Sequence, residues 1–187
     1  ASLREYYRIR FADGQTRVLM KMPEGYSSVS EEVTKSTGQI RELPFLNVQK
    51  YLTKYGVRVP RVDIYSEKDG LMVLEDLGDN TFEKVFRSSS RSEGLELYRR
   101  ALKLLASFQK GTRERDEGCV VFHRGFDEDL LFWEFNHFLE YGIEDRLNLK
   151  IPPAQRKKFE EIGHAICREI VSLPQGLTHR DFQSRNI

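Results

Sequence analysis

Polar and apolar residues alternate near the start of the chain in the way that half-buried strands do. Apolar side chains at residues 7–11 alternate with charged ones, and Asp13-Gly14 then supplies the pair of residues that a tight hairpin turn favours. The largely apolar runs at residues 18–22 and 71–74 have the length of buried strands. Residues 24–39 are polar and without period, so we expect a long, mobile loop there.

Later segments carry apolar residues three or four positions apart, which is the spacing of one helix face. The first such segment spans residues 45–55 and is followed by Gly56, a residue typical of the position after a helix. The others span residues 98–109, 131–141 and 159–170. We therefore expect four amphipathic helices, with the one at residues 131–141 ending at the following glycine.

The change from strands to helices falls at residues 75–80. Asn80 and Glu83 have the spacing of a capping box and predict a helix start. The polar stretch at residues 87–94 predicts a connector before the next helix. Strands first and helices afterwards predict an α+β fold in two lobes, with a hinge near residues 75–80.

Composition and charge narrow the class of protein. The chain has 187 residues, of which 39% are hydrophobic and 32% charged, as in ordinary soluble globular proteins. The net charge of +1 provides no field that would recruit nucleic acid or an anionic membrane, so we expect neither partner. We see no signal peptide or membrane span, and the two cysteines stand in unrelated contexts; a reduced, cytoplasmic setting is expected.

The strongest chemical pattern is at residues 179–187. Asp181 stands two residues after His179, and Asn186 follows five residues later, which is the spacing of a phosphoryl-transfer catalytic loop. The aspartate could accept the proton of an attacking hydroxyl while the asparagine holds a magnesium ion. A kinase also needs a second metal-binding aspartate beyond this point, so we expect these 187 residues to be part of a kinase and inactive alone. The alternative is a polar surface turn.

Two side chains and one stretch of main chain could hold a nucleotide. Lys21 lies in the middle of an expected strand and could neutralise phosphates, although a solvated strand lysine is the simpler interpretation. Glu42 could pair with Lys21, in competition with Glu31 and Glu32, or could only favour the start of the next helix. The main chain at residues 75–77 could bond the edge of adenine, or be an ordinary connector.

Other motifs are absent or ambiguous. The sequence contains no G-x-G-x-x-G, no G-x-x-x-x-G-K-[ST] and no G-x-S-x-G, which excludes a Rossmann fingerprint, a P-loop and a nucleophile elbow. The aromatic run at residues 132–138 contains Glu134 and His137, either of which could contact an acceptor. Core packing on one side of a helix is the other interpretation of this run.

Four segments together resemble the aminoglycoside/choline kinase-like phosphotransferase family. The resemblance is to its bacterial sugar-kinase branch, which includes the anomeric kinases of N-acetylmuramate and N-acetylglucosamine. Residues 2–8 are similar to the S-x-R-x-Y-x-R loop of that branch, residues 18–23 to the strand that follows it, residues 73–79 to its hinge and residues 179–186 to its catalytic loop.

The resemblance implies a protein-kinase-like two-lobe α+β fold. An N-terminal antiparallel sheet lobe, residues 1–77, would bind the nucleotide, and residues 78–187 would form an incomplete helical C-terminal lobe that ends in the catalytic loop. The implied cofactors are ATP and Mg²⁺.

The same resemblance assigns roles around the nucleotide. Ser2 would touch phosphate, Lys21 would contact the α- and β-phosphates, and Glu42 would position that lysine. Adenine would bond the carbonyl of Glu75 and the N–H of Leu77.

For the reaction, the resemblance makes Asp181 the base and Asn186 a magnesium ligand. The implied activity is ATP-dependent transfer of the γ-phosphoryl group to a hydroxyl of a sugar, amino sugar or aminoglycoside-like acceptor. Gln183 stands where that branch often has histidine, which leaves the choice of acceptor open. Two alternatives remain: a kinase-like protein that binds a nucleotide or partner without catalysis, and a protein kinase.

Overall fold

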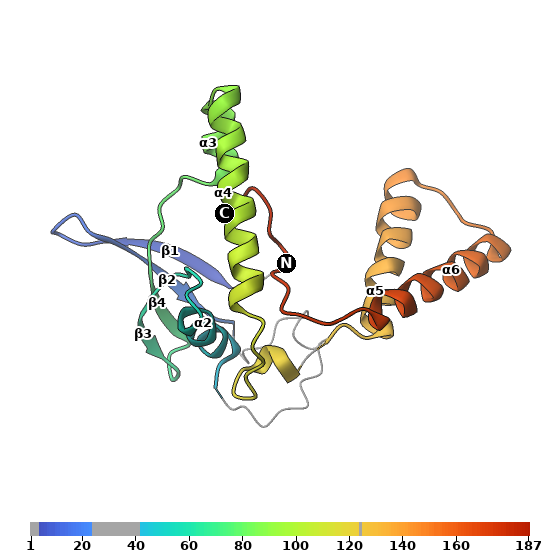
Figure 1. The fold of residues 1–187 in the computed structure, drawn as a ribbon, viewed down its shortest axis with the longest axis horizontal. Coiled ribbons are helices and arrows are strands. Elements are labelled where there is room, and N and C mark those ends of the chain that lie inside the picture. Colours follow the sequence, from blue (N-terminus) through green and yellow to red (C-terminus); the bar gives the residue numbers. More distant parts are fainter. Residues whose placement is uncertain (1–3, 24–41, 124) are drawn as a thin grey trace. The chain divides into compact units, whose positions relative to one another are not determined.

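The computed structural model describes residues 4–23, 42–123 and 125–187. Within this part, residues 4–23, 42–123 and 176–187 form one compact unit, and residues 125–175 form a second (Figure 1). The expected loop at residues 24–39 and the predicted phosphate contact Ser2 lie outside the described residues. The predicted lobes, residues 1–77 and 78–187, stay a prediction.

The first unit contains a four-stranded antiparallel sheet. Its strands, in the spatial order β1-β2-β4-β3, are β1 (Glu5–Arg10), β2 (Thr16–Lys21), β3 (Val62–Ser66) and β4 (Leu71–Glu75). Gly14 closes the β1–β2 hairpin at φ 84°, a backbone conformation that glycine adopts at little cost. The strands and the hairpin predicted from the sequence pattern are thus confirmed, and with them the α+β class.

One face of the sheet makes the core of this unit. Met20 of β2 lies directly opposite Met72 of β4, and both side chains are completely buried. The buried cluster on this face is Met20, Met22, Met72 and Leu74. Since side chains alternate along a strand, Leu19 and Lys21 belong to the opposite face.

Helix α2 (Pro44–Lys54) packs against the core face of the sheet through Phe45 and Leu46. Pro44 occupies the first turn, where its missing N–H costs nothing, and Gly56 follows the helix at φ 74°. The helix predicted at residues 45–55 is confirmed. The buried side chain of Asn47 ties it to a later segment by donating to the carbonyl of Gly118 (2.8 Å) and accepting from the N–H of Val120 (2.7 Å).

Two helices follow the connector, and here the sequence prediction was partly wrong. Helix α3 (Phe82–Ser88) is capped by Thr81, whose hydroxyl accepts from the N–H of Lys84, rather than by Asn80. The expected connector at residues 87–94 is mostly helical. Ser90 and Glu93 form a capping box, and this box starts helix α4 (Arg91–Gly111) directly after α3.

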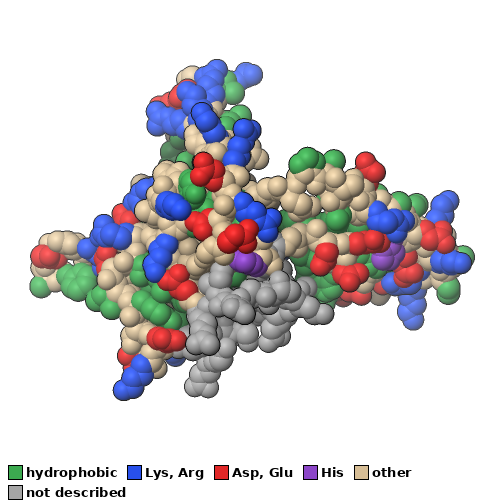
Figure 2. Space-filling view, turned by 60° about the horizontal axis from the view of Figure 1, so that its bottom comes forward, with side chains coloured by type: hydrophobic (Ala, Val, Ile, Leu, Met, Phe, Trp, Pro, Cys, Tyr) green, Lys and Arg blue, Asp and Glu red, His purple; other side chains and the backbone are tan. Residues whose placement is uncertain are grey.

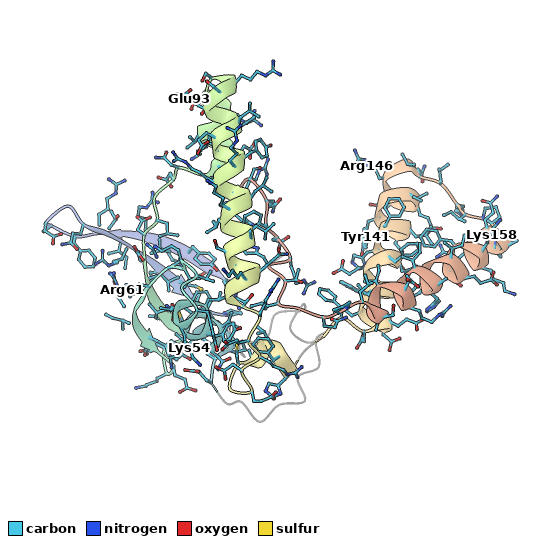
Figure 3. The ribbon with its side chains drawn as sticks, viewed as in Figure 1. Lys54, Arg61, Glu93, Tyr141, Arg146 and Lys158 are labelled. Atoms are coloured by element: carbon cyan, nitrogen blue, oxygen red, sulfur yellow. The ribbon has the colours of Figure 1, made fainter. Side chains whose placement is uncertain are left out.

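The start of α4 is labelled at Glu93 in Figure 3. Rings of Phe82, Phe86 and Tyr98 pack together between α3 and α4, with centroids 5.0–5.9 Å apart. A short 3₁₀ helix, η1 (Val120–His123), completes this part of the first unit.

The second unit is helical. Helix α5 (Glu128–His137) continues into a π-helix, η2 (Phe138–Asp145), and α6 (Pro153–Ser172) packs against α5. The predicted end at Gly142 was wrong, because the chain changes to π-helical bonding and continues through that glycine. Gly163 of α6 lies so close to α5 that an added Cβ would sit 2.6 Å from a ring carbon of Phe135.

The described surface mixes both signs of charge. Figure 2 shows acidic and basic side chains interspersed over one face, in keeping with the net charge of +1. Among the described helices, none has the length and apolar character of a membrane span.

Candidate active site

Residues 179–187, called the HRD loop below, form consecutive tight turns. The N–H of Asp181 donates to the carbonyl of His179 (2.8 Å), and the N–H of Gln183 donates to the carbonyl of Asp181 (2.9 Å). Arg180 between them has a φ of 66°, in the left-handed region that non-glycine residues seldom occupy. This winding leaves the Asp181 side chain exposed.

Asp181 and Asn186 are linked within the loop. The side-chain nitrogen of Asn186 donates to the main-chain carbonyl of Asp181 (3.0 Å). Within the described residues, the carboxylate of Asp181 and the carboxamide oxygen of Asn186 have no hydrogen-bond partner. A carboxylate that can accept a proton and an oxygen of the type that Mg²⁺ prefers are therefore both available on one loop.

The ring of His179 packs against two aromatic side chains. Its ring meets the buried ring of Phe108 on α4 edge-on, with centroids 6.1 Å apart, and meets Phe182 in the same way at 5.5 Å. The segment that carries the loop runs beside α4 (Figure 1). These contacts fix the base of the loop to a long helix.

Lys21 and Glu42 are not brought together. The ammonium of Lys21 lies 3.4 Å from the carboxylate of Glu5, and both side chains are more than half exposed. Glu42 instead pairs with Lys50 and accepts from the side chain of Asn47 (3.2 Å). The ammonium of Lys50 is the main cause that lowers the pKa of Glu42 below its usual value.

The sheet explains this separation. Lys21 lies on the face opposite Met20 and Met22, whereas α2, which follows Glu42, packs on the face of those methionines. The roles of Lys21 and Glu42 toward a nucleotide stay predictions.

The connector after β4 carries the predicted adenine contacts. The carboxylate of Glu75 accepts from the guanidinium of Arg58 (2.6 Å) and from the N–H of Arg61 (3.1 Å), and Arg58 is the main cause of its lowered pKa. Figure 3 labels Arg61 beside the sheet. Leu77 is 61% exposed, and its N–H makes no hydrogen bond within the described part of the chain. That N–H is thus available to a ligand.

Sequence reasoning missed the residue that fixes this connector. The guanidinium of Arg8 binds the carboxylate of Asp76 (2.7 and 3.0 Å) and that of Asp79 (2.7 and 2.9 Å). The Asp76 side chain is only 5% exposed, and Arg8 is the main cause that lowers its pKa to about 2. Gly78 lies between the two aspartates at φ 81° and donates its N–H to Asp76 (2.9 Å).

A signal for this arrangement was present in the sequence. Arg8 ends the S-x-R-x-Y-x-R pattern, and both aspartates belong to the hinge pattern at residues 73–79. Nothing in the sequence paired the two patterns, because 68 to 71 residues separate the partners.

The candidate acceptor residues lie on α5 of the second unit. The His137 ring is flanked by Trp133 (centroids 4.1 Å apart) and by Tyr141 (4.9 Å), which Figure 3 labels. The Nδ1 atom of His137 is buried without a hydrogen-bond partner among the described residues. Glu134 is exposed on the same helix. A role of His137 or Glu134 toward an acceptor stays a prediction.

No family model matches the sequence. Over its whole length, however, the chain is similar to proteins named as sugar kinases, the class that the HRD loop indicates. It is 28% identical over 189 residues to the N-acetylmuramate/N-acetylglucosamine kinase of Neisseria meningitidis. It is 26% and 24% identical over 187 residues to proteins of the same name from Pseudomonas aeruginosa and Pseudomonas putida.

The similarity confirms the predicted resemblance to this branch of sugar kinases. The whole chain is covered in each comparison, but it spans only about half the length of these relatives, namely 50%, 48% and 48%.

Proposed function

We propose that the chain is the nucleotide-binding and catalytic-loop part of an ATP-dependent sugar kinase. The observation that carries the proposal is the HRD loop, in which Asn186 bonds the main chain of Asp181 and both side-chain oxygen groups stay available. The similarity to proteins named as sugar kinases supports the same activity. The two-lobe arrangement, with residues 1–77 above the nucleotide and 78–187 below it, is part of this proposal.

In the proposed reaction the acceptor hydroxyl attacks the γ-phosphorus of ATP in line with the bond to ADP. The carboxylate of Asp181 orients that hydroxyl and takes its proton as the new O–P bond forms and the bond to the β-phosphate oxygen breaks. Asn186 would hold Mg²⁺ through its carboxamide oxygen, and the bound ion would neutralise charge on the phosphates.

The nucleotide would lie against the sheet unit. The exposed N–H of Leu77 and the carbonyl of Glu75 would bond adenine, while Lys21 would turn from Glu5 toward the phosphates. This change is small in energy, because the pair of Lys21 and Glu5 is an exposed ion pair and such pairs contribute about 0–1 kcal/mol.

For the acceptor we propose an N-acetylated amino sugar rather than a polycationic antibiotic. A polycation needs unpaired carboxylates, and two of the carboxylates at the acidic start of α5 are already engaged within the protein. Asp127 caps the helix by accepting from the N–H of Leu130 (2.8 Å). Glu128 is bound by His164 (2.8 Å) and by Arg168 (3.1 Å).

The test is ADP release by the full-length protein with N-acetylglucosamine, N-acetylmuramate and an aminoglycoside as acceptors. Asp181→Asn should lower kcat by about 10²–10⁴-fold, the usual contribution of a general base, while nucleotide binding measured by calorimetry persists. Asp69→Asn is the matched control, because that exposed aspartate lies on the β3–β4 turn and should leave kcat unchanged.

Two outcomes would decide against this assignment. Full turnover by the Asp181→Asn variant would remove Asp181 from the mechanism. Nucleotide binding without ADP release for any acceptor would favour the non-catalytic alternative.

A further inference from the structure

The first turn of α3 is bonded to the end of the HRD loop. The N–H of Phe82 donates to the carbonyl of Ile187 (2.6 Å), and the N–H of Glu83 donates to the carbonyl of Ser184 (2.9 Å). The first N–H groups of a helix have no partner inside the helix, so they need acceptors from elsewhere. Here the loop supplies acceptors for the first two of these groups, and Thr81 supplies one for the third.

An ion pair joins the same two segments. The carboxylate of Glu83 accepts from the Nε of Arg185 through one oxygen (2.8 Å) and from Arg87 through the other (2.7 and 3.1 Å). Glu83 is 24% exposed on its side chain, so water competes only in part for the carboxylate. Arg87 is four residues along the same helix, whereas Arg185 is 102 residues away. Of the two ion pairs of Glu83, only the one with Arg185 therefore restrains the loop, in addition to the two main-chain bonds.

We propose that Glu83 is a positioning residue for phosphoryl transfer, acting through Arg185 on the loop that carries Asp181 and Asn186. Arg185 is the immediate neighbour of Asn186, whose side chain supports the main chain of Asp181. When Arg185 loses its partner, the loop loses its only described ion pair with α3, and Asn186 moves with it. The inference rests on the proposed kinase activity, since it assigns Glu83 a part in it.

The experiment compares Glu83→Ala, Arg185→Ala and the double variant in the full-length protein. We expect each single variant to lower kcat by about 10- to 100-fold, because a displacement of about 1 Å in a catalytic group costs up to 10²-fold. The KM for ATP should stay within about twofold. The double variant should lose no more than either single variant, since both remove the same contact.

Arg87→Ala is the matched control. It removes the other partner of Glu83 and one positive charge, as Arg185→Ala does, but leaves the bond to Arg185 intact. Its kcat should equal that of the unchanged protein. An equal loss in Arg87→Ala, or multiplied losses in the double variant, would overturn the positioning role and leave only helix stabilisation.

A second measurement separates this inference from the proposed function. Hydrogen–deuterium exchange of residues 179–187 should be about tenfold faster in Glu83→Ala and unchanged in Arg87→Ala, whether or not the protein turns over. If the unchanged protein transfers no phosphoryl group, the proposed function fails while exchange still reports the restraint. Unchanged exchange in Glu83→Ala overturns the inference even when the kinase activity is present.

Discussion

Met72 is the residue through which the sheet core can be tested most directly. Its side chain is completely buried beside Met20 of the neighbouring strand. Both methionines belong to the face of the sheet on which α2 packs. The same sheet carries Lys21 and leads into the connector with Leu77. Truncation to alanine therefore probes the platform of the proposed nucleotide site without touching a proposed contact.

The size of the effect follows from burial and from the neighbours. Truncating a buried methionine to alanine costs about 2–5 kcal/mol, the sum of lost burial and the cavity left behind. Met20 and Met22 border the site, and flexible methionine side chains fill gaps well. We therefore expect Met72→Ala to cost about 2–3 kcal/mol, near the lower end of that range. Ile64→Ala is the control, because Ile64 of β3 is 62% exposed and should cost at most about 1 kcal/mol.

Hydrogen–deuterium exchange on peptides of β2 and β4 measures this cost. A loss of 2–3 kcal/mol in the opening free energy speeds exchange by about 30- to 150-fold, since each 1.4 kcal/mol is tenfold. Peptides of α5 and α6 should be unaffected, because they belong to the other compact unit. Equal acceleration in Met72→Ala and Ile64→Ala would refute the assignment of this face as the core.

Two further predictions concern packing and pH. Gly163→Ala should destabilise the contact of α5 with α6 by about 1–3 kcal/mol, because the new methyl group meets the Phe135 ring. The measurement is thermal unfolding, with Gly125→Ala as the control, because an added Cβ at Gly125 would meet no atom within 4 Å apart from its chain neighbours. The bond to Arg8 holds the pKa of Asp76 at about 2, against an ordinary value of 3.8. The stabilisation of the folded protein by this ion pair is therefore complete above about pH 4 and is lost as the pH falls through 2. Asp76→Asn should remove that part of the acid dependence of the unfolding temperature, and an identical acid dependence in both proteins would contradict it.

Local patterns predicted most elements because each element depends on neighbours in sequence. The alternation before Asp13-Gly14 gave the first hairpin, and Gly56 marked the position after α2. Two wrong predictions, a connector at residues 87–94 and a helix end at Gly142, have local reasons as well. The capping box of Ser90 and Glu93 stood inside a stretch judged only by its polarity. The π-helix at Gly142 keeps the chain helical where a glycine ordinarily ends a helix.

The candidate site likewise has a part that local patterns predict and a part that they do not. The spacing of Asp181 and Asn186 identified the HRD loop because both residues lie on one short stretch of chain. The bond between them is equally local. The local pattern did not predict which cation pairs with which carboxylate. In the structure Lys21 pairs with Glu5, and Glu42 pairs with Lys50.

The sequence alone therefore determined most of the strands and helices, the first hairpin and the chemistry available on the HRD loop. Only the tertiary structure decided that Arg8 clamps the connector and that Glu83 holds Arg185. The physical reason is range. Backbone periodicity and turn geometry are set within about ten residues, whereas an ion pair across 71 or 102 residues depends on strand register and helix packing, which no local pattern contains.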